Sequence, residues 1–377
     1  MNITELTTKL VSIPSYVGDT SNEIEIAEFI FQYLKQFKYL KTEKQFIDKK
    51  RFNVIATTKG KPALLIAGHM DTVEPKQGWT KNQFGKNIIG DKLYGLGAAD
   101  MKGGIAAILC ALSNLKDISG LTLLFYCDEE YDFAGMKYFI NNYKRPLPKL
   151  AIVAEPSNLK IGNSCRGLID IKFSVQGKTG HAANPKNGVN AITKLNEILI
   201  DLNIWLQQFK NKQLDKPTMN VAYLKGGLRL PDKNKLVLGQ QGNNIADYAE
   251  TIIDIRTTSN KLRAKQVKQW IVKQIKKQRL ALLDFEVRHD LGSLFTDPKK
   301  LSKIESILKQ TFNKFEYEVA QNNGYGDGQM LQEYLEMDVI SLGTSFNNIH
   351  GVDEFVTISS LKQIEKIYTK LIQTYCD

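Results

Sequence analysis

The sequence predicts an α/β protein with a mainly parallel sheet and a smaller α+β domain inserted into it. Three observations predict this class. Strand-like and helix-like segments alternate in the first part of the chain, the order changes to β-α-β-β-α-β from Gly167, and a helix, a strand and a helix follow the insertion. Helices between consecutive strands imply parallel strands covered on both faces. We therefore expect residues 1–166 and 291–377 to form one domain and residues 167–290 another.

Hydrophobic periodicity supports each element of the main domain. Apolar residues recur at helical spacing in "NEIEIAEFIFQYLKQF", which predicts a helix over residues 22–37. The same reading predicts helices at 103–115, 134–143, 299–313 and 359–375, and short strands at 52–58, 63–69, 121–130, 149–156 and 338–343. In such sheets, ligands collect beyond the carboxyl ends of the strands.

The insertion has a pattern of its own. It reads as a strand at 168–177, a helix at 188–209, strands at 218–227 and 248–258, a helix at 262–278 and a strand at 283–290. This order is the ferredoxin-like arrangement, which makes a compact domain of about this size.

Composition excludes several classes of function. The chain has 377 residues, of which 42% are hydrophobic and 24% charged, as in an ordinary globular protein. The net charge of +11 comes from scattered lysines without interleaved aromatic residues, so we expect no nucleic-acid partner. Because no apolar stretch reaches the roughly 18 residues of a membrane span and no signal-peptide pattern opens the chain, we expect a cytoplasmic protein with no membrane partner. The four cysteines form no CxxC pair, which argues against disulfides and a thiolate zinc site.

The strand "LLIAGHMDTV" at residues 64–73 ends in two polar side chains. Residues i and i+2 of an extended chain point to the same side, so Asp71 could accept the second ring N–H of His69. Metal-binding histidines are oriented in this way. The alternative is a solvated loop that begins one residue early.

Acidic or histidine clusters follow the other strands as well. They are "GLGAADMKGG" (95–104), "CDEEYDFAG" (127–135), "AEP" (154–156) and "NNIHGVDEF" (347–355). Together they offer the candidate metal ligands His69, Asp100, Glu130, Glu155 and His350, with the aspartate shared by two ions and each ion also held by one histidine and one glutamate. Nitrogen and oxygen donors without thiolate suit zinc, cobalt or manganese.

Each cluster also has an ordinary structural interpretation. Asp100 could cap a helix, "DEE" could be an exposed turn, and Glu155 and His350 could be polar loop residues. The four interpretations would all have to place acids or histidines at strand ends by chance.

The chain resembles the family of acetylornithine deacetylase and succinyl-diaminopimelate desuccinylase, which are dinuclear zinc hydrolases related to carboxypeptidase G and aminoacylase. The resemblance covers nearly the whole chain, in the family's order. It is carried by "GHMDTV", "GLGAADMKGG", "DEE", "AEP", "GKTGHAANP", "NNIADYAETIIDIR" and "IHGVDEF".

The resemblance implies a zinc-peptidase-like catalytic domain with two divalent metal ions, zinc first and cobalt second. One ion would be held by His69 and Glu155 and the other by Glu130 and His350, with Asp100 between them. Glu129 would be the general base, and Asp71 would orient His69.

The resemblance also implies that the insertion is a lid and dimerisation domain of a homodimer. His181 would reach the active site of the partner subunit and hydrogen-bond the carbonyl oxygen of the substrate. Asn243 and Arg256 would bind the substrate's carboxylate, for which a guanidinium is suited. Two alternatives stay open: His181 could be an ordinary loop residue, and Arg256 could pair with Asp254 or Glu250.

The implied activity is hydrolysis of an N-acyl-L-amino acid, acetylornithine or a similar molecule, to a carboxylic acid and the free amino acid. A desuccinylase is an alternative, but Cys165 and Leu168 stand where desuccinylases commonly carry arginine and serine. A di- or tripeptidase would use the same site. The distant alternative is a noncatalytic binding protein, which the full set of ligands disfavours.

Overall fold

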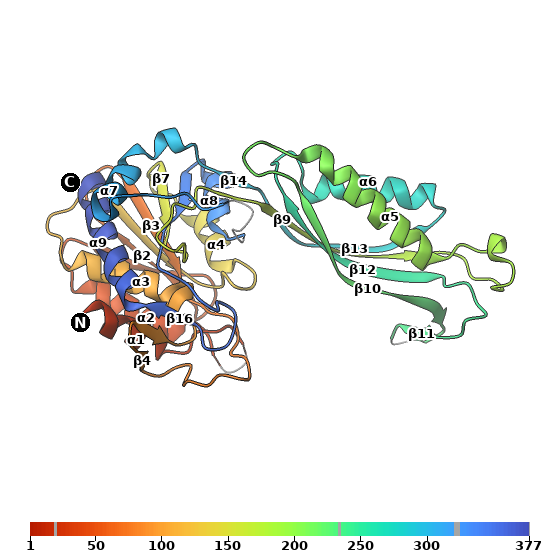
Figure 1. Cartoon of the computed structure of the whole chain (residues 1–377), viewed down its shortest axis with the longest axis horizontal. Coiled ribbons are helices and arrows are strands. Elements are labelled where there is room, and N and C mark those ends of the chain that lie inside the picture. Colours follow the sequence, from red (N-terminus) through yellow and green to blue (C-terminus); the bar gives the residue numbers. More distant parts are fainter. Residues whose placement is uncertain (19–20, 233–234, 320–324, 377) are drawn as a thin grey trace. The chain divides into compact units, whose positions relative to one another are not determined.

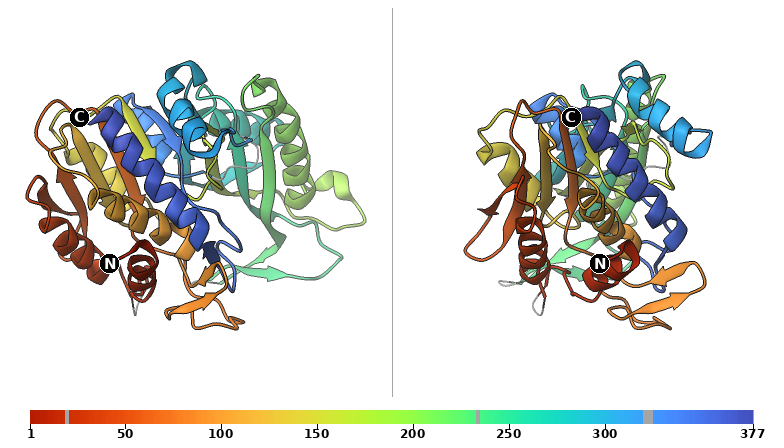
Figure 2. Two further views of the ribbon diagram at one scale, coloured as in Figure 1. Left: turned by 60° about the vertical axis from the view of Figure 1, so that its left-hand side comes forward. Right: turned by 90° about the vertical axis from the view of Figure 1, so that its left-hand side faces the viewer.

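The computed structural model describes residues 1–18, 21–232, 235–319 and 325–376. The chain divides into two compact units. Unit 1 comprises Met1–Ser164 and Phe295–Asp377, and unit 2 comprises Cys165–Leu294. Both chain termini belong to unit 1 (Figure 2).

Unit 1 contains a six-stranded sheet in the order β1-β2-β6-β3-β7-β15 (Figure 1). Its strands are β1 (Lys41–Phe46), β2 (Phe52–Thr57), β3 (Leu64–His69), β6 (Leu121–Tyr126), β7 (Leu150–Val153) and β15 (Asp338–Ser341). The pairs β6–β3, β3–β7 and β7–β15 are parallel, whereas β1–β2 and β2–β6 are antiparallel. The predicted mainly parallel α/β sheet is confirmed, with an antiparallel hairpin at one edge.

Helices cover both faces of this sheet. They are α1 (Ile3–Val11), α2 (Ile24–Lys35), α3 (Gly103–Leu112), α4 (Ala134–Asn142), α7 (Ser302–Phe312), α8 (Gly328–Leu335) and α9 (Ile358–Tyr375), with the short helical turns η1 (Ala98–Lys102) and η4 (Pro298–Lys300). The larger hydrophobic core is formed by α1, α2, α3, α7 and α9 together with every second residue of the strands, which places these helices on one face of the sheet. Helices α4 and α8 contact each other and lie outside this core.

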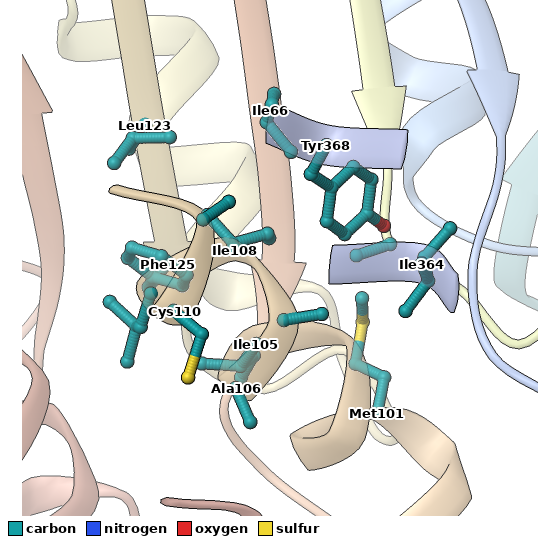
Figure 3. Packing of buried hydrophobic residues seen from close by; sticks show 14 of the residues in the cluster. Ile66, Met101, Ile105, Ala106, Ile108, Cys110, Leu123, Phe125, Ile364 and Tyr368 are labelled. Carbon is teal, nitrogen blue, oxygen red and sulfur yellow. The ribbon is translucent and has the colours of Figure 1, made fainter. Parts of the chain in front are cut away.

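Helix α3 forms the centre of that core. All of its residues are buried, as expected for a helix that is apolar all round. In Figure 3, Ile105 and Ile108 lie between the sheet residue Phe125 and the α9 residues Ile364 and Tyr368. The Tyr368 hydroxyl donates to the carbonyl oxygen of Leu342 over 2.5 Å, so the polar group of this buried ring is satisfied.

A small sheet in the order β16-β5-β4 lies beside the sequence clusters predicted to be functional. Its strands are β4 (Asn87–Ile89), β5 (Lys92–Tyr94) and β16 (Phe355–Thr357). Phe355 pairs with Tyr94, so the segment after His350 runs antiparallel to the segment that leads into η1. Two distant parts of the sequence are thereby joined.

Unit 2 is a five-stranded antiparallel sheet in the order β11-β10-β12-β9-β13. Its elements are β9 (Gly167–Gln176), η2 (Pro185–Asn187), α5 (Ala191–Leu206), η3 (Gln207–Phe209), β10 (Thr218–Leu230), β11 (Val237–Gly239), β12 (Tyr248–Thr257), α6 (Ala264–Lys277) and β13 (Ala281–Leu291), and the two-residue strands β8 (Ser164–Cys165) and β14 (Leu294–Phe295) lie where the chain passes between the units. Phe173, Leu199 and Ile271 belong to its separate core. The predicted β-α-β-β-α-β order is present, with β11 as an addition.

Among the described residues, no helix combines the length and the apolar character needed to cross a membrane.

Candidate metal centre

Three of the five predicted metal ligands lie at or just beyond the carboxyl ends of adjacent strands. His69 is the last residue of β3, Glu130 lies four residues after β6, and Glu155 lies two residues after β7. Asp100 lies inside η1 with a φ of −118° and a ψ of 95°, and it does not cap α3, because Lys102 occupies the N-cap position of that helix. The pattern of strand ends explains why residues from separate parts of the chain meet here.

A close approach of α3 to β7 brings the Asp100 turn toward Glu155. A Cβ atom on Gly104 would lie 2.5 Å from the carbonyl oxygen of Ala154, a distance that no side chain tolerates. The second glycine of "DMKGG" therefore permits this contact.

The side chains form two overlapping groups that share Asp100. In one, His69 Nε2 lies 3.2 Å from Asp100 Oδ1 and 3.8 Å from Glu155 Oε1. In the other, His350 Nε2 lies 3.4 Å from Asp100 Oδ2 and 3.0 Å from Glu130 Oε1. The two oxygens of one aspartate thus face two different histidines.

Asp71 holds the neighbouring acids through their backbone. Its Oδ1 accepts the N–H of Glu129 over 3.1 Å, and its Oδ2 accepts the N–H of Glu130 over 2.9 Å. His69 Nδ1 lies 3.1 Å from the carbonyl oxygen of Asp71 and 3.6 Å from its carboxylate. If Nδ1 carries the ring proton and donates it to this carbonyl, the lone pair of Nε2 faces Asp100 and Glu155.

Electrostatics at the site favour added positive charge. Burial raises the pKa values of Glu129 and Glu155 well above the usual range of a glutamate. Hydrogen bonds to Asp100 and Glu130 raise the pKa of His350 to about 10. Burial opposes charging of His69, but its contacts with Asp100 and Asp71 raise the pKa of that imidazole as well. Crowded carboxylates thus hold protons on their histidine neighbours, and cations would relieve the same repulsion.

The donor set fits two divalent ions. Each group supplies one imidazole and two carboxylates, and its ligand atoms lie within 4.8 Å of one another. His69 also forms such a group with Glu129 and Glu130, so Glu129 lies within reach of the same centre. Imidazole and carboxylate donors without thiolate suit zinc, cobalt or manganese.

The predicted substrate residues of unit 2 fall into two places. The N–H of Ala182 donates to the carbonyl oxygen of Asn243 over 2.9 Å, so His181 and Asn243 lie on adjacent exposed loops. Arg256 lies near the other end of β12, and Nε and Nη2 of its guanidinium donate to both carboxylate oxygens of Asp254 at 2.8 and 3.0 Å. The pairing with Asp254 that the sequence left open is therefore present.

The length of β12 separates these two places. Arg256 follows Tyr248 by eight residue steps along the strand, which corresponds to about 26 Å at about 3.3 Å per residue. Asn243 precedes Tyr248 by five further residues. Within one copy of unit 2, His181 and Arg256 are too far apart to touch the same small amino acid.

Two buried acids near the centre were not singled out from the sequence. Glu354 belongs to the segment "IHGVDEF", and its carboxylate accepts backbone N–H groups around Asp100. Asp327 accepts the hydroxyl of Tyr126 over 2.7 Å. The signal for Glu354 was an acid four residues after His350, but its hydrogen bonds require the β16–β5 pairing.

Comparison with known proteins identifies the family. A sequence profile of peptidase family M20/M25/M40 matches residues 65–374. The chain belongs to this family. The match includes all five candidate ligands, and M20 proteins are enzymes, so the protein is a metallohydrolase that acts on amide bonds.

Similar M20 proteins include deacetylases and peptidases. The acetylornithine deacetylase of Buchnera aphidicola subsp. Schizaphis graminum is 29% identical over 385 residues, which cover 97% of this chain and 96% of that protein. An M20 family metallo-carboxypeptidase from Sulfolobus solfataricus superposes with a TM-score of 0.77 at 16% identity, covering 100% of this chain and 99% of that one. The YXEP protein of Bacillus subtilis, a dinuclear metal-binding M20 peptidase, gives a TM-score of 0.70 at 16% identity over 99% of this chain and 97% of that one. The predicted family and fold class are thus confirmed.

Proposed function

We propose that this M20 enzyme hydrolyses the amide of an N-acyl-L-amino acid of the acetylornithine type, releasing a carboxylic acid and the free amino acid. The observation that carries the proposal is the pair of ligand groups sharing Asp100, with Glu129 beside them. The acyl-amino-acid substrate class is supported by the full-length similarity to acetylornithine deacetylases.

The proposed centre holds two divalent ions, zinc first and cobalt second. His69 and Glu155 would hold one ion, Glu130 and His350 would hold the other, and Asp100 would contact both. When bound, such ions polarise the substrate carbonyl and lower the pKa of water.

Glu129 is the proposed general base. Its backbone is fixed by Asp71, and its side chain lies in the same group as His69 and Glu130. Glu129 takes a proton from the attacking water and passes it to the leaving amine nitrogen. Burial raises the pKa of this carboxyl in the metal-free site, which favours its carrying a proton between the two steps.

Recognition of the substrate is assigned to unit 2, acting as a lid. His181 holds the carbonyl oxygen as negative charge develops on it. Arg256 binds the amino acid's carboxylate, in competition with or beside Asp254. Because His181 and Asn243 lie at the opposite end of β12 from Arg256, we propose a homodimer in which the two ends act on one substrate from different chains.

A substrate panel tests this function. The metal-loaded protein is assayed with zinc and with cobalt on N-acetyl, N-succinyl and dipeptide substrates that share one amino acid. We expect the N-acetyl substrate to have the largest kcat/KM. Preference for the succinyl substrate would indicate a desuccinylase, preference for dipeptides a peptidase, and no hydrolysis of any by protein that holds both ions would contradict the proposed function.

A further inference from the structure

Glu354 lies beneath the turn that carries Asp100. Its side chain is buried, with 1% of the residue exposed. One carboxylate oxygen accepts the N–H groups of Ala99 and Asp100 at 2.8 and 3.1 Å, and the other accepts the N–H of Gly97 at 3.1 Å. Three donors of a single turn therefore converge on one carboxylate.

These three N–H groups depend on Glu354 because the turn departs from regular helix. Gly97 has a φ of 75°, in the left-handed region, and Asp100 is not helical. In this turn, the N–H of Ala98 donates to the carbonyl oxygen of Gly95, and the N–H of Lys102 donates to the carbonyl oxygen of Gly97. Without Glu354, the N–H donors of Gly97, Ala99 and Asp100 would be buried and unpaired, which destabilises this conformation of the turn.

The turn also has little room to move. A Cβ atom on Gly97 would lie 2.5 Å from Cγ2 of Thr72, the residue after Asp71. The turn thus packs directly against the segment that follows β3. A small displacement of its backbone would move the Asp100 carboxylate relative to His69.

Glu354 is itself fixed to both segments that supply ligands. Its carbonyl oxygen accepts the N–H of Gly95 over 3.0 Å, and the next residue, Phe355, pairs with Tyr94. His350 lies four residues earlier in the same segment. Glu354 therefore links the turn that bears Asp100 to the segment that bears His350. His350 Nε2 lies 3.4 Å from Asp100 Oδ2.

Three backbone dipoles stabilise the carboxylate of Glu354, whose pKa burial and the charge of Asp100 raise to about 7. Among the residues that the structure describes, no ion pair within 4.0 Å involves Glu354. Lys102 is also fully buried, and its ammonium donates to the carbonyl oxygen of Ile13 over 2.7 Å. Burial lowers the pKa of Lys102 to about 7, and the charge of Glu354 opposes that shift. An ionised carboxylate bound by three N–H groups gains strong, charge-assisted hydrogen bonds.

We propose that Glu354 is a positioning residue for the metal centre. Its three hydrogen bonds hold the Asp100 turn so that one carboxylate oxygen faces His69 and the other faces His350. The role rests on the proposed metal-dependent function. Loss of these hydrogen bonds is expected to weaken the binding of both ions, because Asp100 belongs to both ligand groups.

The decisive measurement is metal affinity, not activity. Zinc and cobalt dissociation constants are measured for metal-free wild type, Glu354→Gln and Glu354→Ala by competition with a chelator, and cobalt absorption reports the ligand geometry. Glu354→Gln keeps an acceptor for two N–H groups but turns an amide nitrogen toward the third donor. We expect affinity to fall about 10- to 100-fold in Glu354→Gln, the range typical of residues that orient metal ligands, and further in Glu354→Ala.

Asp247→Asn provides a matched control. Asp247 is a buried carboxylate of unit 2 that accepts the N–H of Arg229 over 2.8 Å and the side-chain amide of Gln176 over 3.0 Å. Its substitution also removes a buried charge that accepts a backbone N–H, but in a unit without a proposed metal ligand. We expect Asp247→Asn to lower the stability of metal-free protein and to leave the metal affinities within twofold of wild type.

The outcomes separate positioning from a merely structural role. If Glu354→Gln is less stable to urea when metal-free but binds both ions with wild-type affinity and absorption, the proposal is overturned. If the glutamine variant does not fold, Glu354→Asp replaces it, since the shorter carboxylate keeps the charge but cannot reach all three donors. If wild type itself binds fewer than two ions, the proposed dinuclear function fails independently of Glu354.

Discussion

The proposed metal ligands of unit 1 are buried or half-buried except His350, whose side chain is 50% exposed, whereas the loop residues proposed to bind substrate in unit 2 are exposed. In unit 1, the His69 side chain is 1% exposed, and the backbones of Glu129 and Glu130 are held by Asp71. In unit 2, His181 and Asn243 are exposed loop residues. A buried, hydrogen-bonded set keeps its geometry in the absence of substrate, whereas exposed loop side chains adopt theirs when a ligand or a second chain covers them.

This difference separates two kinds of experiment. We expect changes in unit 1 to alter metal content and the chemical step, and changes in unit 2 to alter substrate recognition. Each of the following measurements could break that division.

Removal of metal is expected to have the largest effect. A chelator should abolish turnover while circular dichroism shows that the fold survives, because the sheet and the α3 core do not depend on the ligands. Added zinc or cobalt should restore activity. Full turnover by protein shown to be metal-free by elemental analysis would refute the metal-dependent mechanism.

The adjacent acids of "DEE" are expected to differ in kind. Glu129→Gln should keep both ions yet lose about a hundredfold to ten-thousandfold in kcat, as expected for a general base. Glu130→Gln should lose metal, since an amide oxygen is a weaker ligand than a carboxylate. Metal content and rate are measured for both variants, and the reverse pattern would show that the two roles are exchanged.

Arg256→Ala should weaken recognition rather than chemistry. We expect a loss of about 2 to 5 kcal/mol in transition-state binding for substrates with a free carboxylate, the range for truncating one partner of a buried charge pair. Substrates with that carboxylate amidated should lose little more. The control is Asp254→Asn, which removes the observed ion-pair partner but keeps the guanidinium. Equal turnover of free and amidated substrates by wild type would assign Arg256 a structural role with Asp254.

The separation of His181 from Arg256 predicts complementation between chains. His181→Ala and Glu129→Ala proteins should each be inactive, and a mixture that exchanges subunits should regain part of the wild-type rate, because one site of a mixed dimer has both residues intact. The readout is activity against mixing time, with each variant incubated alone as the control. A fully active monomer by light scattering would contradict the arrangement.

Removal of a helix cap in each unit tests whether the two units unfold together, and its effect on stability is expected to be the smallest of these changes. Asn2 caps α1 of unit 1 by accepting the N–H of Glu5, and Asn190 caps α5 of unit 2 by accepting the N–H of Thr193, at 3.0 and 3.1 Å. Substitution of either by alanine should cost about 1 kcal/mol of unfolding free energy. Urea unfolding is followed in each variant. If the two units unfold together, both variants should shift the same transition, and if each core unfolds alone, each variant should shift only the transition of its own unit.

Much of the fold followed from local pattern. Buried strands such as β3 and β6 and the apolar helix α3 were predictable because periodicity and burial agree in them. The pattern missed β1, because its sequence "KTEKQF" is polar and it forms an edge of the sheet with only partial burial. It also missed β11, because a three-residue strand is too short to show a hydrophobic period and forms by pairing with β10.

Local sequence patterns were enough to identify which residues could serve the centre, because parallel strands deliver their carboxyl ends to one edge of a sheet. How these residues combine depends on contacts between distant segments. Glu130 and His350 lie 220 positions apart and meet through the β16–β5 pairing, which also brings Glu354 beneath Asp100. A backbone hydrogen bond from Ala182 to Asn243 likewise sets Asn243 beside His181, and the length of β12 keeps both away from Arg256. Local patterns specify the direction and burial of a side chain, but the distance between two such side chains depends on strand pairing and strand length, which are fixed only when the whole sheet forms.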